Sequence, residues 1–137
     1  MAETIRKVDY FYITAPNKPG EGAKVLAALR DAGINLLAFS GFPQGGKAQI
    51  DFVPENTAAF KAAARKIRLR LSTKKTGFLI QGEDRPGAVA GLVEKLAAAN
   101  VNVTALDAIA AGEGRYAAIL WVKPPFLRKA AKALGCR

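Results

Sequence analysis

The heptapeptide Gly82-Glu83-Asp84-Arg85-Pro86-Gly87-Ala88 occurs in two related forms along this chain. The other form, Ala15-Pro16-Asn17-Lys18-Pro19-Gly20-Glu21, lies 67 residues earlier. Each form follows a short apolar run and precedes the pattern of an amphipathic helix. Residues 11–38 match the residues 67 positions later at nine of 28 places, where average composition gives about two. The sequence therefore predicts a tandem repeat of one supersecondary unit.

Length and composition limit what the chain can be. The repeat divides the 137 residues into two modules of about 65–70 residues each, which we place at residues 1–73 and 74–137. Half of the residues are apolar, which is enough for packed cores. No apolar run reaches the ~18 residues of a membrane span, and the N-terminal residues lack the apolar core of a signal peptide. A cytoplasmic location is therefore expected.

The chain has no histidine and one cysteine, Cys136. These counts exclude a Ser-His-Asp triad, a Cys-His pair, a His-ligated metal site and an internal disulfide. No pair of carboxylates stands out as a catalytic acid and base. We therefore expect a protein that is not an enzyme and that holds no metal and no cofactor.

The formal net charge of +10 favours contact with polyanions such as nucleic acid. No acid occurs between Glu55 and Glu83, whereas seven cations do: Lys61, Arg65, Lys66, Arg68, Arg70, Lys74 and Lys75. RNA-binding modules of similar topology stack bases on aromatic residues of the sheet. Their signature is absent here, so we interpret the cations as a solvated face and the aromatic residues as buried. Nucleic acid is the less favoured partner.

Hydrophobic periodicity predicts the order βαββαβ in the first copy. Residues 7–14 form a strand, and a helix that starts near Gly20 ends at Gly33. Residues 34–42 and 48–53 form a hairpin around a turn at 43–46. A second helix, capped by Asn56 or Thr57, precedes a strand at residues 67–72.

The second copy repeats this pattern except for its last strand. Strands are expected at 77–81, 101–109 and 115–122, with a helix after Gly87 and another at 126–134. A βαββαβ unit places both helices on one face of an antiparallel sheet. The expected fold class is therefore α+β, with two tandem ferredoxin-like βαββαβ modules, the second of which lacks its last strand.

The missing strand has a consequence for assembly. A sheet without its closing strand exposes an edge, and soluble proteins rarely leave an edge uncovered. We expect a homodimer, or an edge that residues 67–72 or a partner's strand cover. The strand at 116–122 is apolar on both faces, which also indicates packing between sheets or subunits.

Two segments of each copy resemble the ACT domain family. In the second copy these are the Asp84-Arg85-Pro86-Gly87 loop before its helix and Ala99-Asn100-Val101-Asn102-Val103 after it. The first copy has Asn17-Lys18-Pro19-Gly20 and Ala32-Gly33-Ile34-Asn35-Leu36. ACT domains are small βαββαβ modules that bind amino acids and regulate metabolic enzymes. The resemblance covers nearly the whole chain, with no catalytic domain attached, and implies a regulatory protein with a metabolic enzyme as a possible partner.

The resemblance also implies the residues of two ligand sites. In ACT pairs the ligand lies between the loop of one module and the second strand of its neighbour. One implied site combines Asn17, Lys18, Pro19 and Gly20 with Asn102 and Val103. The other combines Asp84, Arg85, Pro86 and Gly87 with Asn35 and Leu36, or their equivalents across a dimer.

Elementary chemistry supports the same residues. A helix that begins at Gly20 or Gly87 leaves free N–H groups at a partly positive end, which suits a carboxylate. Asp84 can accept an ammonium group, and Asn17 can do so more weakly. Asn35 and Asn102 each offer a donor and an acceptor.

Each of these features also has a structural interpretation. Pro-Gly is an ordinary turn into a helix, and an asparagine often stabilises the junction of a helix and a strand. Many ACT modules bind nothing and serve as pairing surfaces. We therefore expect a protein that senses an amino acid at an interface between modules or subunits. A ligand-free dimerising regulatory subunit is the main alternative, and an RNA- or polyanion-binding protein is a less favoured one.

Overall fold

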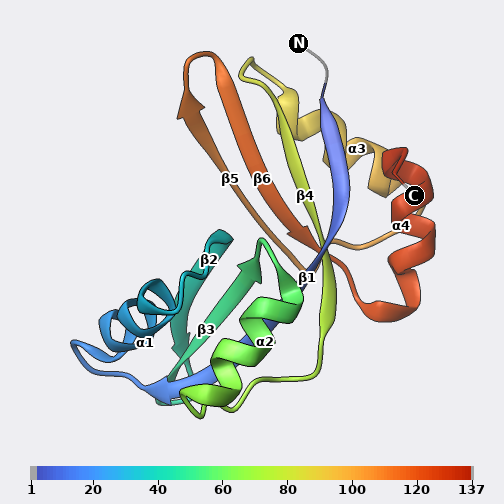
Figure 1. The fold of residues 1–137 in the computed structure, drawn as a ribbon. Coiled ribbons are helices and arrows are strands. Elements are labelled where there is room, and N and C mark those ends of the chain that lie inside the picture. The colour runs from blue at the N-terminus through green and yellow to red at the C-terminus, as the bar shows by residue number, and fades with distance from the viewer. Residues whose placement is uncertain (1–2, 137) are drawn as a thin grey trace. The chain divides into compact units, whose positions relative to one another are not determined.

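The computed structural model describes residues 3–136 and contains six strands and four α-helices in that range (Figure 1). Tertiary contacts divide them into two compact units. The continuous unit is Asp9–Lys75, and the split unit combines the described residues up to Val8 with those from Thr76 onward. The division after Lys75 lies close to the expected boundary at residue 73. Residues 3–8, however, belong with the second copy and not with the first.

The continuous unit contains one three-stranded antiparallel sheet and two helices. Its elements are β1 (Thr4–Pro16) from Asp9 onward, α1 (Glu21–Asp31), β2 (Leu36–Gln44), β3 (Lys47–Pro54) and α2 (Thr57–Lys66). The strand order is β2-β3-β1. Alternate residues of β1 and β3 pack against both helices in a core of Phe11, Ile13, Ala15, Leu29, Ile50, Phe52, Phe60 and Ala63. Both helices therefore cover the same face of the sheet.

The split unit repeats this arrangement. Its elements are β4 (Lys75–Glu83), α3 (Ala88–Ala98), β5 (Ala105–Gly112), β6 (Arg115–Trp121), the short 3₁₀ helix η1 (Pro124–Phe126) and α4 (Leu127–Leu134). The strands pair antiparallel in the order β4-β6-β5. Its core includes Phe78, Ile80, Leu92, Leu96, Val101, Leu120, Ala130 and Leu134. The expected α+β class with antiparallel strands is confirmed.

The repeat also keeps the way in which its first helix ends. Gly33 after α1 has a φ of 75°, and Asn100 after α3 has a φ of 60°. The next amide bonds back into the last helical turn in both copies, from Ile34 to the Leu29 carbonyl at 3.0 Å and from Val101 to the Leu96 carbonyl at 2.9 Å. This is the Schellman arrangement, in which glycine and then asparagine are the residues that best tolerate a left-handed backbone.

Residues 67–72 do not form the expected strand. Arg68 takes a φ of 60°, and the Leu69 amide bonds back to the Ala64 carbonyl at 2.9 Å, which closes α2. The segment then meets β1 at Ser72, whose amide donates to the Tyr12 carbonyl at 2.9 Å. Ile67, Leu69 and Leu71 pack against the core without a strand ladder. Alternating burial was therefore mistaken for strand pairing, and neither copy has a closing strand of its own among the described residues.

The edge beside β4 is covered by a segment that we did not expect there. Strand β1 is the neighbour of β4 in the strand order, and its residues up to Val8 belong to the split unit. Ile5 packs against the core of this unit, and Figure 1 shows the N-terminal half of β1 alongside β4. The expectation of an edge that residues 67–72 or a partner must cover is therefore wrong. The homodimer stays a prediction, without this argument for it.

Other expectations differ only at their limits. Strand β5 begins at Ala105 and not at residue 101, while the hairpin turn of the first copy shortens to Gly45 and Gly46. Both faces of β6 are buried: Leu120 belongs to the core, and Ile119 and Trp121 are buried outside that cluster. The expected cover on both faces is confirmed. None of the helices within residues 3–136 is long and apolar enough to span a membrane.

Candidate functional site

The loop between β4 and α3 carries the features that the repeat predicted. Gly87 precedes the helix with a φ of 84°, a left-handed conformation that L-residues with a side chain rarely adopt. The first intrahelical bond runs from the Gly91 amide to the Gly87 carbonyl at 3.0 Å. No side chain among the described residues caps this helix. The N–H groups of Val89 and Ala90 in its first turn thus lack an intrahelical partner.

A different helix shows what a capped start looks like in this chain. The Asn56 side chain at the start of α2 accepts the Ala59 amide at 3.0 Å. Such a cap satisfies one of the free donors of the first turn. The α3 start has glycine in place of the capping residue, so its amides are available to a bound acceptor.

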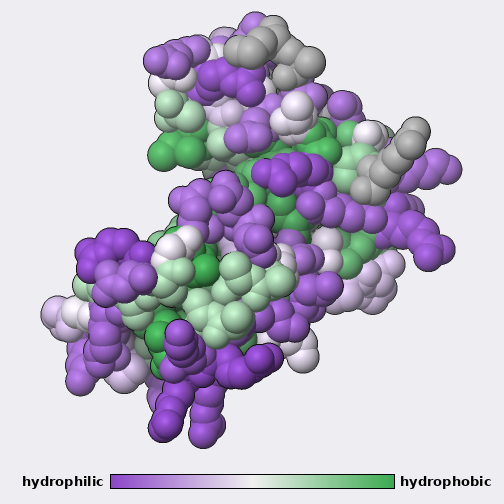
Figure 2. Space-filling model, in the orientation of Figure 1, coloured by the Kyte–Doolittle hydropathy of each residue, from purple (hydrophilic) through white to green (hydrophobic). Residues whose placement is uncertain are grey.

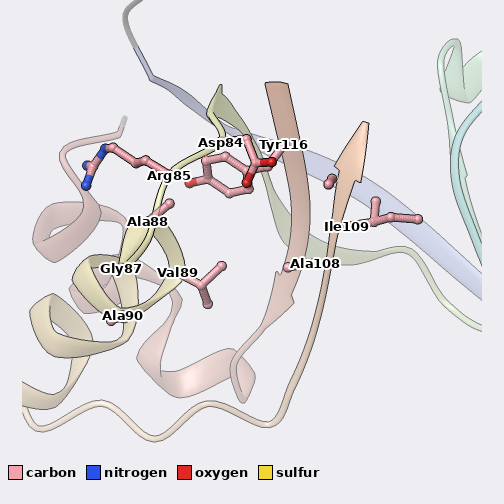
Figure 3. Close-up of a pocket in the computed structure, with 10 residues that line it drawn as sticks. Asp84, Arg85, Gly87, Ala88, Val89, Ala90, Ala108, Ile109 and Tyr116 are labelled. Atoms are coloured by element: carbon pink, nitrogen blue, oxygen red, sulfur yellow. The ribbon is translucent and has the colours of Figure 1, made fainter. Parts of the chain in front are cut away.

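A pocket of about 340 Å³ opens at this helix start (Figure 3). Its size falls within the range of small-molecule sites, roughly 300–1,000 Å³. It is lined by Asp84, Arg85, Gly87, Ala88, Val89, Ala90, Ala108, Ile109, Ala110 and Tyr116. Figure 3 shows Val89 projecting between α3 and β5, while Arg85 points away from β5. The site combines one loop, one helix start and two strands of the split unit.

The loop between β4 and α3 contributes the charged residues of the pocket lining. Asp84 and Arg85 are both exposed lining residues, and Figure 3 shows Asp84 next to the Tyr116 ring. The Asp84 amide donates to the Gly114 carbonyl at 2.8 Å, which fixes the loop to the turn between β5 and β6. The Asp84 carboxylate and the free helical amides thus lie at a pocket whose other lining residues are mostly apolar.

Tyr116 is a lining residue that the sequence analysis did not assign to the site. Its hydroxyl donates to Glu3 Oε2 at 2.7 Å, and the residue is only 4% exposed. Burial, followed by the hydrogen bond to Glu3, raises the pKa of Tyr116 to about 12. Tyr116 pairs with Gly82 across β4 and β6. In the sequence, a glycine expected opposite a strand aromatic could have indicated that Tyr116 belongs to the site. Glu3 is too remote in sequence for its bond to Tyr116 to have been predicted.

The loop of the continuous unit has the same backbone and different neighbours. Gly20 has a φ of 92°, and no side chain among the described residues caps α1. Asn17, Lys18 and Pro19 are exposed, and the Lys18 amide bonds to the Pro16 carbonyl at 3.0 Å. Ala15, at the position of Gly82 in the repeat, pairs with Ala48. No aromatic ring therefore stands at that pair.

The strand residues expected to complete the sites lie outside this pocket. Asn35 Nδ2 donates to Glu55 Oε2 at 3.4 Å, and the Asn35 carbonyl accepts the Glu55 amide at 3.0 Å, which favours a structural role. Leu36 and Val103 pack against the cores of their units. Asn102 is exposed in the segment between α3 and β5. Pro86 belongs to the loop but does not line the pocket.

Three tyrosines and the tryptophan of the strands are the aromatic residues that we considered for base stacking: Tyr10, Tyr12, Tyr116 and Trp121. Tyr116 and Trp121 are buried. Tyr10 is half-buried, and its pKa is raised by burial and then by the Asp51 charge. Tyr12 pairs with Asp51 across β1 and β3, which places an acid beside its ring. These four residues are therefore a poor platform for nucleic-acid bases.

The seven cations of residues 61–75 form a solvated surface, as expected. All except Lys75 are exposed, and none forms an ion pair with a residue that the structure describes. The Lys75 ammonium lies 5.9 Å from the centroid of the Tyr12 ring. Figure 2 shows hydrophilic side chains gathered at the bottom of the view, where the chain leaves α2 in Figure 1.

Comparison with known proteins identifies relatives by fold. The chain matches no protein-family model and no curated protein. Protein BT0572 from Bacteroides thetaiotaomicron is 17% identical, with 94% of this chain and 87% of that chain covered and a TM-score of 0.82. The ligand-free regulatory subunit of aspartate kinase from Thermus thermophilus is 20% identical, with 98% and 93% covered and a TM-score of 0.64.

The regulatory subunit of aspartate kinase from Thermus flavus gives similar values. It is 20% identical, with 98% of this chain and 94% of that chain covered and a TM-score of 0.60. Identities this low establish a shared fold. The chain thus shares the fold of these regulatory subunits over nearly their whole length.

Proposed function

We propose that this chain is a non-catalytic regulatory protein that binds an amino acid, or a related amino-bearing carboxylate, in the pocket of the split unit. The observation that carries the proposal is the uncapped start of α3 in the same pocket as Asp84. One feature attracts a carboxylate and the other an ammonium group. These are the two groups that every free α-amino acid carries.

The carboxylate would lie at the start of α3. Val89 and Ala90 line the pocket and belong to the first helical turn, whose amides lack intrahelical partners. The helix end is partly positive, which favours an anion. Gly87 has no side chain to obstruct the approach, and a Cβ added to it would meet no atom within 4 Å.

The rest of the ligand would lie between Asp84 and β5. The Asp84 carboxylate can pair with an ammonium group. Ala88, Ala108 and Ala110 provide small apolar walls. Their short side chains leave room for the side chain of the amino acid.

The regulatory part of the proposal rests on fold. The regulatory subunits of aspartate kinase cited above share the architecture of almost the whole chain. A chain built from two such units suits a role as the regulatory partner of a metabolic enzyme. We extend the proposal to a homodimer in the cytoplasm, with no bound cofactor.

Thermal-shift measurement against the twenty amino acids, followed by calorimetry, tests the binding site. A ligand that binds only the native state raises its apparent stability. Asp84→Asn should weaken binding about tenfold to a hundredfold, because it removes a charged partner worth ~1.5–3 kcal/mol. Asp107→Asn is the matched control, since Asp107 is exposed on β5 and does not line the pocket. Equal losses in both variants would contradict the assignment.

A ligand-free dimerising subunit is the second candidate. Strand β5 lies at the end of the strand order, and its Ile109 is 71% exposed. An exposed apolar edge strand is suited to pairing with another chain. If calorimetry detects no amino acid at millimolar concentration while sedimentation shows a dimer, this candidate replaces the sensor.

A further inference from the structure

The Tyr116 side chain belongs to two structural features at once. Its ring lines the pocket, while its hydroxyl donates to Glu3 Oε2 at 2.7 Å. Glu3 immediately precedes β1, the strand that covers the open edge of β4. The pocket wall and the N-terminal strand are thus joined through one hydrogen bond.

Gly82 makes this contact possible. A Cβ on Gly82 would lie 2.9 Å from Tyr116 Cε1 and 3.3 Å from Glu3 Cγ. The ring and the Glu3 side chain therefore both lie directly over the glycine backbone. A larger residue at this position would displace one of them. The three residues form a close-packed group at the pocket wall.

The strand that carries this contact continues into the other unit. Residues up to Val8 belong to the split unit, and Asp9 onward belongs to the continuous unit. Both parts lie on the single strand β1, Thr4–Pro16. Residues 4–8 are held by Ile5 against the core, by the buried Val8, by pairing with β4 and by the bond at Glu3. The segment is short, so the loss of one of these contacts can weaken its docking.

We propose that the Tyr116–Glu3 hydrogen bond couples occupation of the pocket to docking of residues 4–8. The inference rests on the proposed function, because it requires a ligand against the Tyr116 ring. An amino acid in the pocket would hold the ring in place and so keep its hydroxyl at Glu3. Coupling of this kind is reciprocal, so undocking of the strand must weaken binding by the same factor. Tyr116 is thus a positioning residue through which ligand binding in the pocket affects residues 4–8 of β1, the strand that both units share.

Hydrogen exchange on the full chain tests the contact first without any ligand. Tyr116→Phe keeps the ring and removes the hydroxyl, and Glu3→Gln keeps the length and removes the charge. Each should lower the protection of the amides of residues 4–8 by about tenfold. Tyr12→Phe makes the same chemical change on β1 itself without touching Glu3, and should leave that protection unchanged. Unchanged protection in both the Tyr116→Phe and the Glu3→Gln variant overturns the proposal.

The second arm adds an equimolar mixture of the twenty amino acids at millimolar concentration. Protection of the unmodified protein should rise both at residues 88–90 and at residues 4–8. In Tyr116→Phe the response at residues 4–8 should be lost. A rise at residues 88–90 alone overturns the coupling and leaves the proposed function intact. A lack of response at both places overturns the proposed function, and the coupling with it.

Discussion

The loops before α1 and α3 have similar backbone conformations but different neighbouring residues. Gly20 and Gly87 take φ values of 92° and 84°, and each precedes a helix without a side-chain cap among the described residues. Across the sheet, however, Ala15 pairs with Ala48, whereas Gly82 pairs with Tyr116. The pocket described above lies at the second loop. The repeat therefore preserves the backbone of the helix start, while the cross-strand pair beside it differs between the two copies.

The two loops also differ in the residue that could bind an ammonium group. Asp84 at the second loop corresponds to Asn17 at the first, so only the second copy has an acid at this position. The two copies have diverged in the groups that would touch a ligand while the glycines and the helix ends stayed alike. Four experiments test this comparison, from the largest expected effect to the smallest.

The first experiment removes the equivalent core residues Phe11 and Phe78. Both are almost completely buried, at 2% and 0% exposed. Phe→Ala in a core typically costs ~3–5 kcal/mol. We expect each change to lower the free energy of unfolding by about that amount and to reduce amide protection mainly in its own unit. Hydrogen exchange measures this, and equal loss of protection in both units after either change would show that the two units unfold as one.

The second experiment replaces Gly20 and Gly87 by alanine in separate variants. Each glycine has a positive φ, which costs an L-residue ~1–2 kcal/mol. The stability losses should be similar, because space is not limiting at either position. Amino-acid binding should fall only in Gly87→Ala, which can be checked by calorimetry. Loss of binding in Gly20→Ala would move the site to the first copy.

The third experiment concerns pH. The pKa of Tyr116 is raised to about 12 in the folded state, from an ordinary value of 10.0. The folded protein therefore holds this proton more tightly than the unfolded chain. The stabilisation is complete below pH 10 and is lost as pH rises toward 12. Denaturant unfolding should show a smaller loss over this range in Tyr116→Phe than in the unmodified protein. Tyr10→Phe serves as a control, because the pKa of Tyr10 is also raised while Tyr10 does not line the pocket. Identical pH dependence in Tyr116→Phe and the unmodified protein would contradict the account.

The fourth experiment compares Asn35 and Asn102. The pocket geometry predicts that Asn102→Ala changes amino-acid affinity by less than about twofold, as is usual for an exposed residue. Asn35→Ala should reduce stability slightly, by ~0.5 kcal/mol, because it removes the 3.4 Å bond to Glu55. Calorimetry and denaturant unfolding measure the two effects. A tenfold loss of affinity in Asn102→Ala would instead support a site that extends beyond this pocket.

Local signals in the sequence predicted most of the fold. The repeat, the helix starts at Gly20 and Gly87, a cap at Asn56 or Thr57 and both hairpins follow from patterns within a few residues of each other, and the structure places the cap at Asn56. The strand predicted at residues 67–72 was wrong because Ile67, Leu69 and Leu71 alternate in burial while Arg68 turns the backbone. Alternation reports which side chains are buried and does not show that the backbone is paired.

The sequence analysis named only part of the lining of this pocket for a related reason. Asp84, Arg85 and Gly87 are adjacent in sequence and could be interpreted together. Tyr116 and Glu3 are separated by 113 residues, and only the strand order brings them into contact. The partner strand for the open edge was missed in the same way. Cross-strand neighbours are decided by the whole sheet, so one sequence without a structure contains little information about them.

The sharing of β1 also has a consequence for the order of folding. The continuous unit is complete once Lys75 has been synthesised, and domains generally fold as units during synthesis. Residues 3–8 must then wait for β4 and the rest of the split unit, with their strand edge unpaired. An unpaired edge is a hazard for aggregation, and charged residues protect against it. Arg6 and Lys7 are both exposed in the native strand, so they are available to keep the nascent chain soluble during that interval.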